Sequence, residues 1–130
     1  MSRESITISI GASCFELSLY ATAAARSLVQ ILPQEIRMSR WGDEYYGELS
    51  RRVRHDGDAE RDVFEVGEVA LWPAGNALCI FFGPTPASRS GEPRMASQGV
   101  PFGRIVGDVS ELKKLPGVLD KVVIALQQPA

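Results

Sequence analysis

The first twenty residues contain two short stretches in which hydrophobic and polar side chains alternate. Three isoleucines alternate with threonine and serine in residues 6–10, and a similar alternation fills residues 15–19. A period of two is typical of a strand that buries one face. The turn at residues 11–13 between the two stretches therefore predicts a β-hairpin.

The hydrophobic period then changes to that of an α-helix. From Ala25, hydrophobic residues recur at spacings of three, four and seven, which places them on one helical face. Thr22 is a suitable N-cap, and Pro33 ends the pattern. A second, shorter helix is predicted within residues 108–117, which begin with a variant of a capping box and end in Pro-Gly.

The middle of the chain contains the most hydrophobic predicted strand. Residues 77–82 are hydrophobic without alternation, which predicts a strand that is covered on both faces. Another strand is predicted at residues 68–72, and the Pro-Ala-Gly-Asn between the two suits a type I turn. Residues 51–62 and 83–99 show no period, and we predict loops there. The remaining predicted strands are residues 36–41, 45–49, 63–66, 100–106 and 119–126.

About eight or nine strands with two helices predict a mainly β fold. A closed or nearly closed barrel is favoured because closure leaves no exposed strand edge, and helices would cover its open ends. A two-layer α+β sandwich is the alternative. Neither a repeat nor a boundary interrupts the pattern, so residues 1–130 are predicted to form a single domain.

Composition narrows the classes of partner. The chain has 130 residues, of which 45% are hydrophobic and 23% charged, as in an ordinary globular domain. A formal net charge of −2 gives no basic surface, so we expect no nucleic acid partner. The hydrophobic run of residues 6–10 is too short and too alternating for a signal peptide, and no segment is long enough for a transmembrane helix. We therefore expect a cytoplasmic protein without a membrane partner; the sequence predicts no particular oligomeric state.

Motifs for metal, cofactor or nucleophilic chemistry are missing from the sequence. His55 is the only histidine, which excludes a multi-histidine metal site and a catalytic triad. The acidic residues of 56–62 do not follow the order of an EF-hand loop, and no glycine motif for phosphates or dinucleotides is present. Cys14 and Cys79 lie in hydrophobic stretches, which predicts unreactive free thiols. We predict neither a metal site nor a cofactor.

Three segments carry a resemblance to a known family. Residues 41–46 read WGDEYY, residues 67–86 read GEVALWPAGNALCIFFGPTP, and residues 102–112 read FGRIVGDVSEL. The first two are similar to a family of small, largely uncharacterised prokaryotic proteins with a cyclophilin-like fold, and the third resembles the strand and short helix near the end of a cyclophilin. This resemblance extends over almost the whole chain and implies a cyclophilin-like closed β-barrel of about eight strands capped by two helices.

The resemblance also implies where an isomerase site would lie, because cyclophilins are peptidyl-prolyl isomerases. Phe82 belongs to a Phe-Phe pair like that of cyclophilins and would line the proline pocket, and Arg40 would be the catalytic arginine. However, Ile80 stands where a cyclophilin has glutamine, and residues 85–99 contain neither tryptophan nor histidine. A standard isomerase site is therefore not expected, and an isomerase with an altered site acting through Arg40 is an alternative.

The aromatic residues predict a shallow binding groove instead. Tyr45 and Tyr46 are consecutive, so on a strand one of them must point outward. We predict a barrel that binds a short peptide or a small hydrophobic molecule with an anionic group, without isomerase chemistry. The predicted contacts are Trp41, Tyr46, Trp72 and Phe82, with Asn76 and Arg40 as polar contacts. Arg89 and Arg94, in the second predicted loop, are assigned to solubility rather than to anion binding. A structural or interaction subunit of a larger assembly is a further alternative, supported by fold analogy alone.

Overall fold

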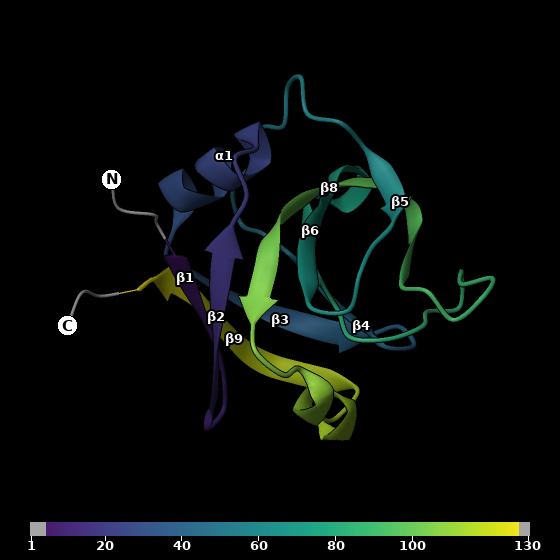
Figure 1. Cartoon of the computed structure of the whole chain (residues 1–130). Helices are drawn as coiled ribbons and strands as arrows, with labels where there is room; N and C mark the ends of the chain where they lie inside the picture. The colour runs from purple at the N-terminus through teal and green to yellow at the C-terminus, as the bar shows by residue number, and fades with distance from the viewer. Residues whose placement is uncertain (1–4, 128–130) are drawn as a thin grey trace.

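The computed structural model describes residues 5–127, whose strands form a closed β-barrel (Figure 1). The strands are β1 (Ser5–Ile10), β2 (Ser13–Leu19), β3 (Gln34–Arg40), β4 (Glu44–Glu48), β5 (Arg61–Val63), β6 (Glu68–Trp72), β7 (Ala77–Phe81), β8 (Arg94–Val106) and β9 (Val118–Leu126). Their order around the barrel is β2-β1-β9-β3-β4-β7-β6-β8, and pairing of β2 with β8 closes this ring. β5 is added outside the ring, on β8.

This architecture confirms the predicted mainly β, closed barrel and shows that the α+β sandwich is wrong. The predicted hairpin of β1 and β2 is also present, with Ile8 opposite Phe15. The hydrophobic residues of the hairpin point into the barrel, where Ile6, Ile8 and Leu17 are fully buried. The ends of the predicted domain, residues 1–4 and 128–130, lie outside the described residues.

One α-helix covers one open end of the barrel. α1 (Ala23–Ile31) begins where predicted, because the Thr22 hydroxyl accepts a hydrogen bond from the Ala25 N–H at 3.0 Å. The Asp58 carboxylate accepts the N–H groups of Ala23 and Ala24, both at 2.9 Å. Asp58 belongs to the predicted loop at residues 51–62, so this loop caps the helix.

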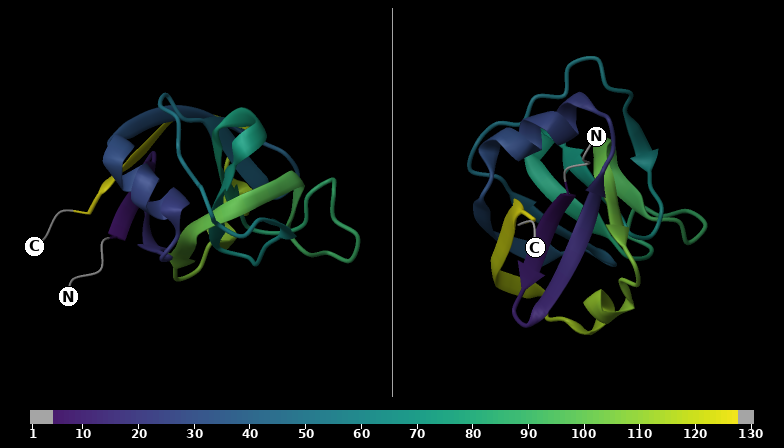
Figure 2. Two further views of the ribbon diagram at one scale, coloured as in Figure 1. Left: turned by 90° about the horizontal axis from the view of Figure 1, so that it is seen from above. Right: turned by 60° about the vertical axis from the view of Figure 1, so that its left-hand side comes forward.

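A short 3₁₀ helix stands in place of the second predicted helix, at the opposite end of the barrel, as Figure 2 shows. η2 (Ser110–Lys114) starts after Asp108, whose carboxylate accepts the Ser110 N–H at 3.1 Å. The expected capping box is wrong in its second half, since Glu111 accepts a hydrogen bond from the Ser13 hydroxyl instead. Within residues 5–127, no helix has both the length and the hydrophobicity needed to cross a bilayer.

The predicted loop at residues 83–99 is wrong in its second half. Residues 94–99 are the first part of β8, where Arg61 of β5 lies opposite Gly99 and Val63 opposite Arg94. This polar, partly exposed segment has no hydrophobic pattern of its own, and its strand conformation comes from pairing with β5. The predicted strand at residues 63–66 is correspondingly shifted to Arg61–Val63.

Two hydrophobic clusters lie on opposite faces of β6 and β7. The larger one fills the barrel and includes Val69, Leu78 and Ile80. A smaller one, which we call the outer cluster, lies on the outside and consists of Phe64, Ala70, Cys79, Phe81 and Met95. The prediction that the β7 strand is covered on both faces is therefore confirmed.

Candidate functional site

The outer face of β4, β7 and β6 is the floor of the candidate site. In the antiparallel register Tyr46 lies opposite Cys79, and Cys79 lies opposite Ala70 on its other side. Directly opposite residues share a face of a sheet, so these three side chains line up across the three strands. Glu44 is two residues before Tyr46 and therefore points to the same face.

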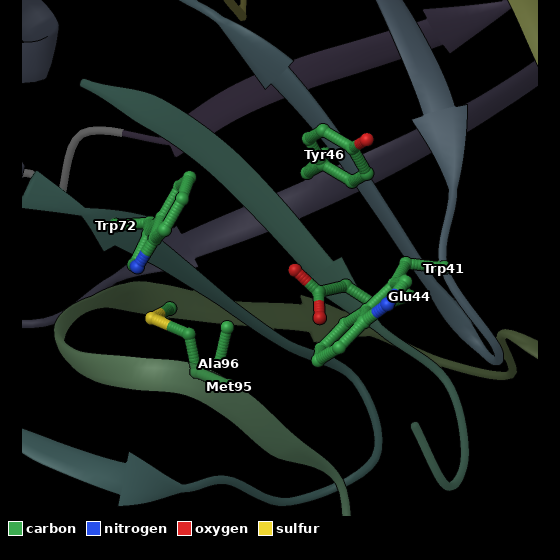
Figure 3. A pocket seen from close by; sticks show the side chains of 6 residues that line it. All are labelled: Trp41, Glu44, Tyr46, Trp72, Met95 and Ala96. Carbon is green, nitrogen blue, oxygen red and sulfur yellow. The ribbon is translucent and has the colours of Figure 1, made fainter. Parts of the chain in front are cut away.

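A cavity of about 320 Å³ opens above this floor, and we call it the outer pocket (Figure 3). It is lined by Trp41, Glu44, Tyr46, Trp72, Met95 and Ala96. Trp41 comes from the turn between β3 and β4, Trp72 from the end of β6, and the last two residues from β8. The structure thus brings together three residues that the sequence analysis grouped, namely Trp41, Tyr46 and Trp72.

The Trp72 ring is held in place from two directions. Its indole N–H donates to the Ser97 hydroxyl on β8 at 2.6 Å. Its six-membered ring lies over Gly75, where a Cβ atom would be 2.9 Å from the ring carbons Cε3 and Cζ3. Residues 73–75 form the 3₁₀ turn η1 (Pro73–Gly75) rather than an isolated type I turn, and glycine is needed in it because the tryptophan folds back over it.

Met95 forms part of the wall of the outer pocket next to Trp72. Its side chain is 2% exposed and packs in the outer cluster. Gly99 makes room for it, because a Cβ atom there would be 2.5 Å from the Met95 sulfur. The wall therefore depends on a glycine within the residues that were predicted to be a loop.

Glu44 is the polar side chain of the outer pocket that the sequence analysis missed. It is 3% exposed, and its Oε1 atom has no hydrogen-bond partner among the described residues. Figure 3 shows its carboxyl pointing into the space between the aromatic rings. Burial raises the pKa of this carboxyl from 4.5 to about 7, although hydrogen bonding from the Cys79 thiol lowers it. At neutral pH the group is therefore present in both protonation states.

The sequence did contain one signal for Glu44. If Tyr45 points into the barrel, both of its neighbours must point outward, Glu44 as well as Tyr46. The strand was instead predicted to begin at residue 45, which left Glu44 outside it, and the pattern alone does not show that other segments cover the outer face. The cavity that Glu44 lines also has walls from Trp72 of β6 and Met95 of β8, which come from distant parts of the chain.

Cys79, at the floor of the site, is not a nucleophile. It is 1% exposed, and burial, followed by the neighbouring Glu44, raises the pKa of its thiol well above the ordinary value. A thiol that stays protonated is a poor nucleophile. Its contribution is to fill the floor and to face the Glu44 carboxyl.

Comparison with known proteins agrees with the barrel topology. A sequence profile of the family described as Cyclophilin-like matches residues 4–125. The chain belongs to the cyclophilin-like family. A solution structure of the hypothetical protein AF2241 from Archaeoglobus fulgidus is 29% identical, with a TM-score of 0.76, over 95% of this chain and 94% of that one. No curated protein matches this chain.

Phe82 lies on the other face of the sheet from the outer pocket. It is 2% exposed, belongs to the cluster that fills the barrel, and stacks on Tyr45 with 5.4 Å between ring centroids. The Phe-Phe pair of the cyclophilin-like motif is thus divided, since Phe81 belongs to the outer cluster and stacks on Phe64. In this structure Phe82 lines no cavity with Trp41, Tyr46 and Trp72.

Arg40 also faces away from the outer pocket. It lies opposite Tyr45 in the register of β3 and β4, and its guanidinium carbon is 5.0 Å from the centroid of the Phe82 ring. Each of its three side-chain nitrogens donates a hydrogen bond within the protein: Nε to the Gly42 carbonyl at 2.7 Å, Nη2 to the Asp43 carboxylate at 2.7 Å, and Nη1 to the Lys113 carbonyl at 3.0 Å. Arg40 therefore holds the end of η2 against the turn that follows β3.

Asn76 supports a loop rather than the outer pocket. Its φ of 47° is left-handed, which asparagine tolerates better than most residues. The side-chain oxygen accepts the Val53 N–H at 3.0 Å, and the side-chain nitrogen donates to the carbonyls of Arg51 at 2.8 Å and Leu49 at 3.3 Å. All three contacts lie in the segment that follows β4, so Asn76 fastens that segment to the turn η1.

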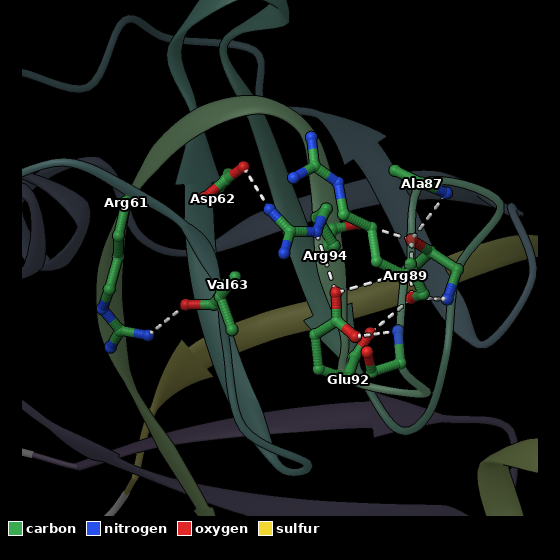
Figure 4. A network of polar contacts seen from close by, with 10 residues as sticks. Arg61, Asp62, Val63, Ala87, Arg89, Glu92 and Arg94 are labelled. Atoms are coloured by element: carbon green, nitrogen blue, oxygen red, sulfur yellow. Dashed lines mark hydrogen bonds and ion pairs between the residues drawn. The ribbon is translucent and has the colours of Figure 1, made fainter.

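Arg94 is paired with acidic residues rather than free at the surface, as Figure 4 shows. Its Nη1 bonds the Asp62 carboxylate at 2.6 Å and its Nε bonds Glu92 at 2.8 Å. The backbone N–H groups of Arg89 and Ser90 also donate to Glu92 and help lower its pKa to about 2. Assigning Arg94 to solubility is therefore wrong; it links the loop before β8 to β5.

Proposed function

We propose that this cyclophilin-like protein binds a small molecule or a short peptide segment in the outer pocket and does not catalyse prolyl isomerisation. The observation that carries this proposal is the unpartnered Oε1 atom of Glu44 in a cavity walled by three aromatic side chains. Leaving a buried polar atom unpaired costs about 1–3 kcal/mol, and such atoms are rare in folded proteins. A ligand with a hydrogen-bond donor would remove that cost.

The size and composition of the outer pocket support the same proposal. About 320 Å³ corresponds to the lower end of the range of small-molecule sites, roughly 300–1,000 Å³. Such sites typically combine hydrophobic and aromatic walls with one or a few polar groups. Here three aromatic residues and Met95 provide the walls, and Glu44 is a polar group that can fix the orientation of a ligand.

The position of Arg40 argues against the isomerase alternative. Catalysis through an arginine requires a guanidinium N–H that is free to reach the substrate amide. The hydrogen bonds of Arg40 to three backbone or carboxylate oxygens leave it engaged within the protein. We therefore expect Arg40→Ala to destabilise the end of the barrel near η2 rather than to change a reaction rate.

The proposal is tested by NMR titration of the isotopically labelled chain. Its two tryptophans both line the outer pocket, so their indole N–H resonances report on it. The probes are a short Ala-Pro peptide and a panel of small amines, amides, alcohols and carboxylic acids. We expect at least one class of probe to shift both indole resonances, with shifts that saturate as its concentration rises.

Matched variants connect those shifts to the outer pocket. Tyr46→Ala removes a wall residue that is 39% exposed, so the fold should persist while affinity falls about tenfold. Val118→Ala changes a side chain of similar exposure on β9 and should leave affinity unchanged. If no probe shifts either indole resonance at millimolar concentration, the proposal is wrong. Faster cis–trans exchange of the Ala-Pro peptide would favour the isomerase alternative instead.

A further inference from the structure

We infer that the ligand of the outer pocket is a small organic cation, a tertiary or quaternary alkylammonium group that lies among the rings of Trp41, Tyr46 and Trp72 and against the Glu44 carboxyl. This inference rests on the proposed function and specifies its ligand class. It replaces the anionic group that the sequence analysis expected.

The charge of the outer pocket is the first argument. Its six lining residues include one carboxyl and no basic side chain. The arginines that the sequence analysis considered do not line it: Arg89 and Arg94, considered for anion binding, and Arg40, a predicted polar contact, are all absent from the lining. The guanidinium groups of Arg40 and Arg94 are engaged elsewhere in hydrogen bonds to carboxylate oxygens. A carboxylate ligand would meet a buried acid without a compensating cation, whereas a cationic ligand would be its counter-ion.

The aromatic walls are the second argument. Two tryptophans and one tyrosine surround the carboxyl from three different elements, as Figure 3 shows. The negative face of an aromatic ring attracts a cation, most strongly in tryptophan, and such rings are the usual recognition device for alkylated ammonium groups. The polarisable sulfur of Met95 completes a wall that suits N-methyl groups.

The number of hydrogen-bond acceptors decides between types of ammonium group. A primary ammonium group has three N–H donors, each of which needs an acceptor when it is desolvated. Among the lining side chains, only Glu44 and Tyr46 carry oxygen atoms. A tertiary ammonium group has one donor, which matches the unpartnered Oε1 atom of Glu44, and a quaternary group has none.

The test uses three ligands of nearly equal shape that differ in charge. Choline is the cation, 3,3-dimethylbutan-1-ol is its neutral carbon analogue, and 3,3-dimethylbutanoate is the anion. Each is titrated into the full chain while tryptophan emission and the two indole N–H resonances are recorded. We expect choline to bind at least tenfold more tightly than the alcohol and the anion to bind most weakly.

Two charge variants on β4 test whether Glu44 causes the preference for choline over the alcohol. Glu44→Gln keeps the shape and removes the charge, and it should reduce the preference for choline over the alcohol to less than threefold. Glu48→Gln removes an exposed charge from the same strand and should leave the preference unchanged. The comparison of ligands on the unmodified chain needs no variant, so it tests the inference independently of Glu44→Gln.

The outcomes separate this inference from the proposed function. If the alcohol or the anion shifts the indole resonances at least as strongly as choline, the cationic ligand class is wrong while binding in the outer pocket stands. If Glu48→Gln lowers the preference as much as Glu44→Gln, the role of Glu44 is wrong. If neither these ligands nor the wider panel affects the indoles, both the inference and the proposed function fail.

Discussion

At the scale of single residues, the chemistry of the outer pocket depends on one carboxyl and its surroundings. Glu44 follows Asp43 directly in the chain, yet the two carboxyls have different environments. Asp43 is paired with the Arg40 guanidinium at 2.7 Å, whereas Glu44 is buried without a cation and its pKa rises to about 7. A buried acid without a partner destabilises the folded protein whenever it is charged.

Glu44→Gln should therefore change how stability depends on pH. The pKa of Glu44 is higher in the folded chain than in the unfolded chain, so its effect on stability is most favourable below pH 4.5 and is lost as the pH rises to about 7. A rise from 4.5 to about 7 corresponds to about 3 kcal/mol. We expect the variant to be more stable than the unmodified chain at pH 8 by up to that amount.

Urea unfolding at pH 5 and pH 8 measures this difference, with Glu48→Gln as the exposed control. The increase in the free energy of unfolding caused by Glu44→Gln, relative to that caused by the control, should be larger at pH 8 than at pH 5. An equal gain at both pH values would mean that the folded-state pKa of Glu44 is not raised.

At the scale of elements, the turn η1 between β6 and β7 links the wall of the outer pocket to a loop outside it. Gly75 provides the space for the Trp72 ring, and Asn76 holds the segment that follows β4. The sequence analysis interpreted the Pro-Ala-Gly-Asn sequence as a turn and Asn76 as a ligand contact. In the structure the turn instead packs against the Trp72 ring through Gly75 and binds the segment after β4 through Asn76.

Gly75→Ala should displace the Trp72 ring. Its new Cβ atom would meet ring carbons at 2.9 Å, so the indole must move and its hydrogen bond to Ser97 weakens. We expect a red-shifted tryptophan emission and affinity for a pocket ligand about tenfold lower, with the fold retained. Ala74→Ser, at the exposed neighbouring position of the turn, should change neither quantity. If both variants behave like the unmodified chain, Gly75 does not position Trp72.

Asn76 allows the side chain and the backbone conformation to be tested separately. Asn76→Gly keeps the left-handed conformation and removes the side-chain hydrogen bonds, including that of the buried Val53 N–H. We expect a loss of about 2 kcal/mol in the free energy of unfolding. Asn76→Ala should lose about 1 kcal/mol more, because alanine is strained at positive φ. Chemical denaturation measures both values, and equal losses would show that backbone strain is unimportant there.

At the scale of the whole molecule, the barrel closes where β8 passes from β6 to β2. Gly103 lies at this crossing, opposite Val69 of β6 and Leu19 of β2. A Cβ atom there would collide with the backbone of Ser18. Backbone cannot move aside as a flexible side chain can, so glycine at this position is a requirement of closure.

Gly103→Ala should therefore destabilise the whole barrel, by about 3 kcal/mol. Gly117→Ala is the matched control, because a Cβ atom at Gly117 would meet nothing within 4 Å. Thermal unfolding followed by circular dichroism compares the two variants. If Gly103→Ala loses no more stability than the control, β2 and β8 are not closely paired in solution.

The sequence alone determined the parts of this protein that depend on local pattern. Alternation predicted the β1–β2 hairpin, Thr22 predicted the start of α1, and the uninterrupted hydrophobic run predicted that β7 is covered on both faces. These features could be predicted because the period of a strand or helix, or the chemistry of a cap, is written in neighbouring residues.

Only the tertiary structure decided which polar group belongs to the pocket. Arg40 and Asn76 are close in sequence to the pocket aromatics, but the register of β3 with β4 turns Arg40 toward Tyr45, and Asn76 turns toward the loop before β5. Burial raises the pKa of Glu44, and the cavity that its carboxyl lines has walls from Met95 and Trp72, which are far away in the sequence. Burial and strand register depend on contacts between distant segments, which local pattern does not encode.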